Sequence, residues 1–195
     1  MIYEITMESK FFEACKDGDL EEVKSYINNG GDVDVRDKDE THENQGPTPL
    51  HLATLHGYHP IVKYLLESGA NYELAYNFVC IDGVEDGNFT ALAVAIQRLE
   101  ADIVKLLLSY GANPLRQVGI ERPMSTYDLV YDPIYEDAMC ESDRQNNGEI
   151  IRLLEKAVKT PRKSRDELLF EESKRLRQER LKNKSFLSGF LNLFG

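Results

Sequence analysis

The feature that most constrains the fold is an internal repeat in the middle of the chain. The sequence TPLHLATLHGYHPIVKYLLESGAN, from Thr48 to Asn71, is followed by TALAVAIQRLEADIVKLLLSYGAN, from Thr90 to Asn113. Both copies begin with threonine and end in Gly-Ala-Asn, and threonine and glycine are equally far apart in each. Repetition at this scale predicts stacked copies of one small unit.

Each copy predicts a pair of helices. Thr48 suits the cap of a helix N-terminus, and Pro49 suits the first helical position. Gly57 interrupts the first helix, Pro60 can start the second, and Gly69 suits a left-handed cap at its end. The apolar stripes of the two helices consist of Leu50 and Ala53, and of Ile61, Val62, Leu65 and Leu66. One such pair cannot bury its own apolar face, so neighbouring copies must stack.

TPLHLA followed by LLESGAN resembles the ankyrin repeat. The resemblance implies an all-α ankyrin-repeat solenoid of about four stacked helix-turn-helix repeats, with long finger loops and a C-terminal helical tail. A weaker copy, SKFFEACKDGDLEEVKSYINNGGDVD, lacks the Thr-Pro start, and a fourth is split between STYDLV and GEIIRLLEKAV by a long insert, residues 131–147. The expected boundaries are 8–158 for the repeat domain, with repeats near 9–40, 48–80, 90–120 and 125–158, and 159–195 for a basic helical tail with an amphipathic end.

The spacing of the two clear copies departs from the family. Their threonines are 42 positions apart, whereas an ankyrin repeat has about 33 residues. The excess falls in ELAYNFVCIDGVEDGNF, which predicts an extended finger loop carrying Tyr76, Phe78, Val79 and Ile81. The first finger, VRDKDETHENQGP, is also long and charged. Long loops of this kind are either functional or disordered.

The resemblance implies that the chain binds another protein along a concave face made by the fingers and the ends of the first helices. We therefore expect a non-catalytic adaptor. The predicted partner-binding residues are Lys16, Asp17, Arg36, Lys38, Asp39, Leu55, His56, Tyr76, Phe78, Ile81, Gln97 and Arg98. Packing of Phe78 and Ile81 onto the next repeat is an equal alternative. In the third copy Leu99 replaces the turn glycine, and Ala91 and Ala93 replace the proline and histidine of TPLH.

Charge and cysteine usage limit the possible partners and location. The chain has a net charge of −11, but residues 159–195 carry ten basic and five acidic side chains, so the remainder is strongly acidic. Nucleic acid is therefore not an expected partner. We see no secretory signal and no membrane span, and three cysteines without a CxxC pair favour a reducing, intracellular, cytoplasmic setting.

Motifs for catalysis or metal binding are not apparent. His51 takes the structural histidine position of TPLH, and its spacing from His56 does not place two ligands on one helical face. The acidic run from Asp32 to Glu43 lacks the glycine of a calcium loop. No P-loop, dinucleotide fingerprint or G-x-S-x-G occurs. We expect no enzyme activity, cofactor or metal; a catalytic site would have to be assembled across the insert at 131–147.

The tail suggests a second possibility. Its last residues place Leu187, Phe190, Leu191 and Phe194 on one face of a short helix, preceded by Phe186 and a basic stretch. Such a segment can cap its own fold, self-associate, enter a partner groove or touch a membrane surface. Clustered glutamates before it are similar to secretion signals of type IV effectors from intracellular bacteria such as Legionella and Coxiella. The alternative function is therefore an effector secreted into a host cell; in either case we expect a monomer.

Overall fold

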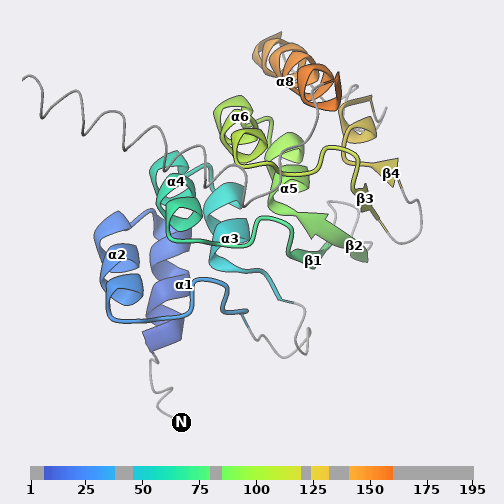
Figure 1. Cartoon of the computed structure of the whole chain (residues 1–195). Coiled ribbons are helices and arrows are strands. Elements are labelled where there is room, and N and C mark those ends of the chain that lie inside the picture. The colour runs from blue at the N-terminus through green and yellow to red at the C-terminus, as the bar shows by residue number, and fades with distance from the viewer. Residues whose placement is uncertain (1–6, 38–45, 80–84, 120–123, 132–140, 160–195) are drawn as a thin grey trace, which may run out of the picture. The chain divides into compact units, whose positions relative to one another are not determined.

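The structure is a computed structural model that describes residues 7–37, 46–79, 85–119, 124–131 and 141–159 (Figure 1). The chain divides into two compact units, residues 1–160 and 161–195. The second unit lies outside the described residues, and with it the predicted amphipathic tail and its candidate membrane-contacting residues. The side chains of a few strand and helix residues at the margins of the described segments, Phe78 among them, are also outside the description.

Three helix pairs stack one after another (Figure 1), so that the first helices of the pairs form one row and the second helices form another. In one row α3 packs between α1 and α5, and in the other α4 packs between α2 and α6. The pairs are α1 (Met7–Asp17) with α2 (Leu20–Asn28), α3 (Pro49–Leu55) with α4 (His59–Glu67), and α5 (Ala91–Gln97) with α6 (Ala101–Ser109). The all-α solenoid predicted from the repeat is confirmed.

The apolar stripes read from the sequence form one continuous core. Leu65, Leu66 and Leu107 are buried and Leu106 is partly buried against the same cluster. The short first helices of the central repeats are buried throughout, from position 49 to 54 in α3 and from 91 to 96 in α5. Because these helices are covered by neighbours on both sides, each repeat depends on the adjacent ones to bury its apolar face.

Helix boundaries follow the local sequence. Thr48 and His51 form a capping box at the start of α3, and the Thr90 hydroxyl accepts a hydrogen bond from the Ala93 N–H at the start of α5. The turn between paired helices requires a left-handed residue, which is Gly57 in the second repeat (φ +73°). Leu99 takes the same place in the third repeat with φ 57°, so a side chain is held there in a conformation that favours glycine.

Carboxylates link neighbouring repeats through the backbone. The Asn71 N–H donates to the Asp34 carboxylate at 2.9 Å, and one repeat later the Asn113 N–H donates to the Glu73 carboxylate at 2.9 Å. Arg116 strengthens the second link by pairing with Glu73 at 3.4 Å. The Gly-Ala-Asn ending of each unit is therefore fixed by an acidic residue of the preceding one.

The extra residues of the second finger form a β-hairpin. Strand β1 (Ala75–Val79) pairs antiparallel with β2 (Glu85–Thr90), with an irregularity between Tyr76 and Phe78. The third finger holds a shorter hairpin, β3 (Gln117–Val118) with β4 (Met124–Ser125), and the Gly119 N–H donates to the Gly87 carbonyl at 2.8 Å. The described strands are thus confined to the fingers, which contact one another.

A fourth helical unit closes the described array. Among its described residues, a 3-10 turn, η1 (Asp128–Tyr131), precedes the 19-residue α8 (Glu141–Lys159), which packs on α6 and η1. Ile150 and Leu154 of α8 are fully buried. The expected insert at 131–147 is therefore shorter than the sequence suggested, because its last seven residues are the start of α8.

Candidate interaction surface

Stacking brings together the predicted binding residues at the ends of the first helices. Lys16 and Asp17 end α1, and His56 and Arg98 directly follow α3 and α5. All four are exposed, whereas Leu55 and Gln97, which precede the last two, are partly buried. Successive first helices lie side by side (Figure 1), so Asp17, His56 and Arg98, each directly before the turn residue, occupy equivalent positions on neighbouring repeats.

Arg36 has a structural role that the sequence did not indicate. Its guanidinium Nη1 donates to the Gly46 carbonyl at 3.0 Å and to the Ala75 carbonyl at 3.1 Å. The side chain is only partly exposed and ties the base of the first finger to β1. Lys38, Asp39 and Ile81 lie outside the described residues, as does the side chain of Phe78, so their predicted contacts stay predictions.

Tyr76 was expected on the binding surface, but the structure buries it. Only 6% of the residue is exposed, and its ring lies 4.6 Å from that of His51 in an edge arrangement. Burial raises the pKa of the Tyr76 phenol. The hairpin begins beside the N-terminus of α3, which directs this side chain into the core, so Tyr76 is left out of the candidate surface.

His51 fixes the start of α3. Its Nδ1 accepts a hydrogen bond from the Thr48 N–H at 3.2 Å and lies 2.8 Å from the Thr48 hydroxyl oxygen. Burial, and secondarily the positive charge of Arg36, lower the pKa of His51 to about 3. The imidazole is therefore neutral at neutral pH and serves as a capping group. Within the described segments, no cluster of three or more His, Cys, Asp or Glu side chains is arranged to hold a metal ion.

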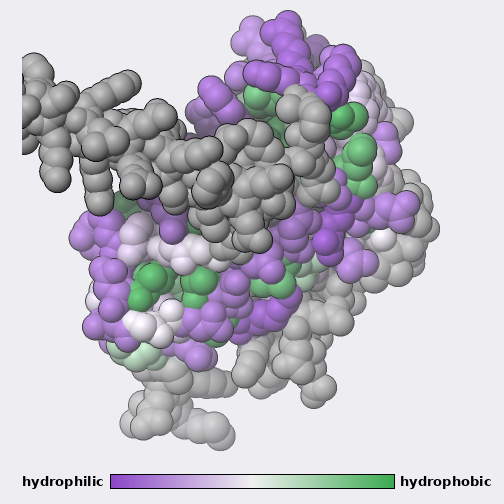
Figure 2. Space-filling model, in the orientation of Figure 1, coloured by the Kyte–Doolittle hydropathy of each residue, from purple (hydrophilic) through white to green (hydrophobic). Residues whose placement is uncertain are grey.

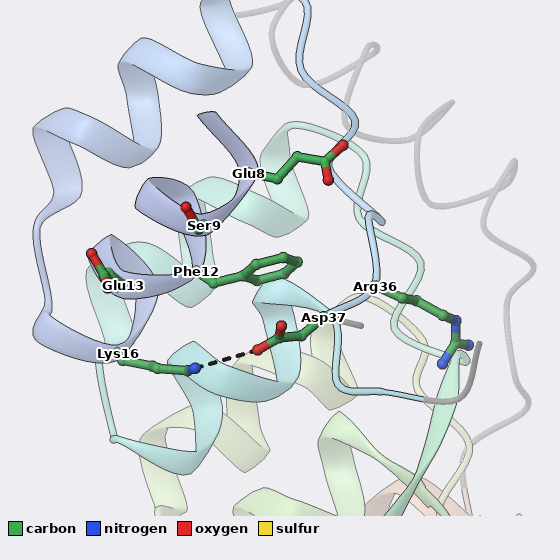
Figure 3. A pocket seen from close by; sticks show the side chains of 7 residues that line it. All are labelled: Glu8, Ser9, Phe12, Glu13, Lys16, Arg36 and Asp37. Atoms are coloured by element: carbon green, nitrogen blue, oxygen red, sulfur yellow. Dashed lines mark hydrogen bonds and ion pairs between the residues drawn. The ribbon is translucent and has the colours of Figure 1, made fainter. Parts of the chain in front are cut away.

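A cavity of about 260 Å³ opens between α1 and the base of the first finger (Figure 3). Phe12 points from α1 into the gap, and Lys16 and Asp37 form an ion pair across it at 3.3 Å. The lining residues are Glu8, Ser9, Phe12, Glu13, Lys16, Arg36 and Asp37. Sequence reasoning identified Lys16 and Arg36 but missed the others. The spacing of positions 8, 12 and 16 on one helical face was the available signal.

Apolar groups on the described surface are scattered. Figure 2 shows hydrophilic residues over much of the described surface in this view, with separate hydrophobic areas. The large exposed apolar side chains of the described segments are Met7, Leu115, Tyr131 and Val158. Among those segments, no helix has the length and apolar character needed to cross a membrane. A partner protein that bound this surface would therefore make mainly polar contacts, and the apolar contacts would be small and separate.

Comparisons with known proteins identify the family. Residues 11–118 match the family described as ankyrin repeats, in three copies. The chain is 35% identical over 110 residues to 26S proteasome non-ATPase regulatory subunit 10 from Dictyostelium discoideum, covering 55% of this chain and 41% of that protein.

Two further relatives align over shorter portions of their length. Protein HOS4 from Saccharomyces cerevisiae is 31% identical over 108 residues, 55% of this chain and 8% of that protein. Protein phosphatase 1 regulatory subunit 27 from Mus musculus is 40% identical over 63 residues, 32% of this chain and 37% of that protein. The chain spans less than half the length of each of these three relatives. Since the family match extends over more than half of the sequence, the chain belongs to the ankyrin-repeat family.

Proposed function

We propose that this chain is a non-catalytic adaptor that binds another protein through its fingers and the exposed ends of α1, α3 and α5. The observation that carries the proposal is the placement of Asp17, His56 and Arg98 at equivalent, exposed positions of successive repeats, directly before the turn residue of each. The inter-repeat carboxylate links hold these positions at a defined spacing. A surface arranged before binding loses less conformational entropy when a partner docks.

Two of the relatives support this proposal by their names, which describe regulatory subunits of the proteasome and of protein phosphatase 1. A regulatory subunit acts by binding another protein. The partner of this chain does not follow from them, because one repeat architecture serves unrelated partners.

Affinity capture with surface variants tests the proposal. The full chain is immobilised, and bound proteins from a cell lysate are identified by mass spectrometry. Replacing His56 and Arg98 together by glutamate should abolish capture of a specific partner, while Lys105→Glu on the exposed side of α6 should leave it unchanged. Both variants should keep the wild-type free energy of unfolding to within about 0.5 kcal/mol, because exposed substitutions rarely affect folding. Equal capture by all three proteins would refute the proposed surface.

An intracellular setting is part of the proposal. The Cys15 thiol is buried, and burial raises its pKa to about 12, which makes it unreactive. This suits a chain that uses cysteine as a small core residue. The alternative of a secreted effector concerns the tail, residues 159–195, which lies outside the described part from residue 160 on. Vesicle flotation of the full chain with and without residues 185–195 tests its membrane component.

A further inference from the structure

We propose that the cavity between α1 and the first finger is a binding site, the seat, for a cationic side chain that a basic segment of the partner protein supplies. This inference rests on the proposed function and names the class of partner. It draws on two observations: the arrangement of side chains around Phe12, and the distribution of charge over the fingers.

The cavity combines an aromatic floor with a carboxylate one helical turn away. Glu8 precedes Phe12 by four residues on α1, and Figure 3 shows the Phe12 ring extending from the helix toward finger residues Arg36 and Asp37. A cation placed over the face of an aromatic ring is attracted by the negative potential of that face. Glu8 would approach such a cation from one side of the ring, while Asp37 on the other side is paired with Lys16.

The two cations that line the cavity are already engaged. Lys16 forms an ion pair with Asp37 at 3.3 Å. Arg36 donates to two backbone carbonyls, and its guanidinium is turned away from Phe12 (Figure 3). Among the described residues, neither Glu8 nor Glu13 is in an ion pair, although the Glu13 carboxylate points to the outer side of α1 (Figure 3). The uncompensated charge next to Phe12 is therefore negative, mainly from Glu8.

The fingers supply the second observation. Residues 32–47 of the first finger contain six acidic and two basic side chains, and residues 72–90 of the second contain four acidic and no basic side chains. These two segments together carry a charge of −8, most of the net −11 of the whole chain. Segments that are dense in charge of one sign attract an oppositely charged partner. An anionic partner such as a phosphorylated segment would be repelled from the same place.

A minimal probe tests the seat directly. The ¹⁵N-labelled full chain is titrated with N-acetyl-arginine amide, and separately with N-acetyl-citrulline amide, which has nearly the same shape without the charge. The expected result is saturable chemical-shift changes for amides near positions 8–16 and 36–37, with arginine binding at least about 5-fold more tightly than citrulline. Equal affinities, or shift changes spread over the chain, would overturn the proposal.

Substitutions separate the seat from nonspecific attraction. Glu8→Gln should weaken arginine binding about 2- to 5-fold, and Phe12→Leu, which keeps an apolar floor without the ring, should weaken it by about the same factor. Glu149→Gln on α8 removes an equal charge from an exposed position outside the cavity and should change nothing. If Glu149→Gln weakens binding as much as Glu8→Gln does, the seat is wrong. Because Glu8 is exposed, its variant remains informative even if Phe12→Leu fails to fold.

The outcome also distinguishes the seat from the adaptor function. A partner that is lost with the His56 and Arg98 double variant but retained with Glu8→Gln would refute the seat and leave the adaptor function standing. Site-specific arginine binding without any captured partner would support the seat and count against the adaptor function.

Discussion

Acid should destabilise this protein through one histidine. His51 is 1% exposed, and its Nδ1 accepts the hydrogen bond that caps α3, so the folded protein needs the neutral imidazole. The pKa of His51 is lowered to about 3 in the folded state, from an ordinary value of 6.5. The unfolded chain therefore takes up a proton as the pH falls below 6.5, whereas the folded protein does not. Stability is present above pH 6.5 and is lost progressively as the pH falls toward 3.

The magnitude follows from proton linkage. At pH 5 the unfolded chain is almost fully protonated at this histidine and the folded chain is not. The free energy of unfolding should therefore be about 2 kcal/mol lower at pH 5 than at pH 7.5 from His51 alone. A loss of that size is a large part of the stability of a small domain.

Urea unfolding at pH 7.5, 6 and 5 measures this contribution when wild type is compared with two variants. In His51→Gln, the amide at the same position can still accept in a capping box, so the drop between pH 7.5 and pH 5 should shrink by about 2 kcal/mol. His56→Gln, which removes an exposed histidine, should keep the wild-type drop. The reasoning is refuted if His51→Gln loses as much stability on acidification as wild type does.

Three further substitutions test the scaffold by urea unfolding at pH 7.5. Gly57→Ala should destabilise by about 1–2 kcal/mol, because φ is +73°, a left-handed conformation that costs energy for a residue with a Cβ; an unchanged midpoint would contradict this. Asp34→Ala removes the acceptor of the Asn71 N–H and should cost about 1 kcal/mol, with faster hydrogen exchange at that amide as its signature. Arg36→Met removes the bonds to both finger carbonyls and should cost about 1–2 kcal/mol; unaltered exchange at the base of the fingers would contradict its tying role.

The repeat units were predictable because their signals are local and doubled. The Thr-Pro start, the apolar stripes and the Gly-Ala-Asn ending each have a direct physical meaning, and the second copy repeats the threonine, the stripes and the ending at the same internal spacing. The beginning of α8 was not predictable in the same way. Its first residues, ESDRQNN, are polar throughout, so they offered no helical stripe to distinguish them from a loop.

The candidate surface was predictable only in part. The ends of the first helices follow from the repeat; Lys16, His56 and Arg98 at these ends are exposed, and their role in binding stays a prediction. Tyr76 was not, because AYNFV has no strict alternation and the irregular pairing beside it decides which face each side chain takes. To predict the cavity, one would need the distance between α1 and the first finger, which lie more than twenty residues apart in the sequence. No local sequence pattern contains that distance.

The carboxylate links between repeats give the array a direction. In each joint the earlier repeat supplies the acceptor and the later one supplies a partly buried backbone N–H. Removing a repeat from the N-terminal side would leave a backbone N–H without its carboxylate acceptor, whereas removing one from the C-terminal side would leave a carboxylate without its N–H donor. Water can hydrate either group, so a truncated array would expose an amide donor at one cut end and a carboxylate acceptor at the other.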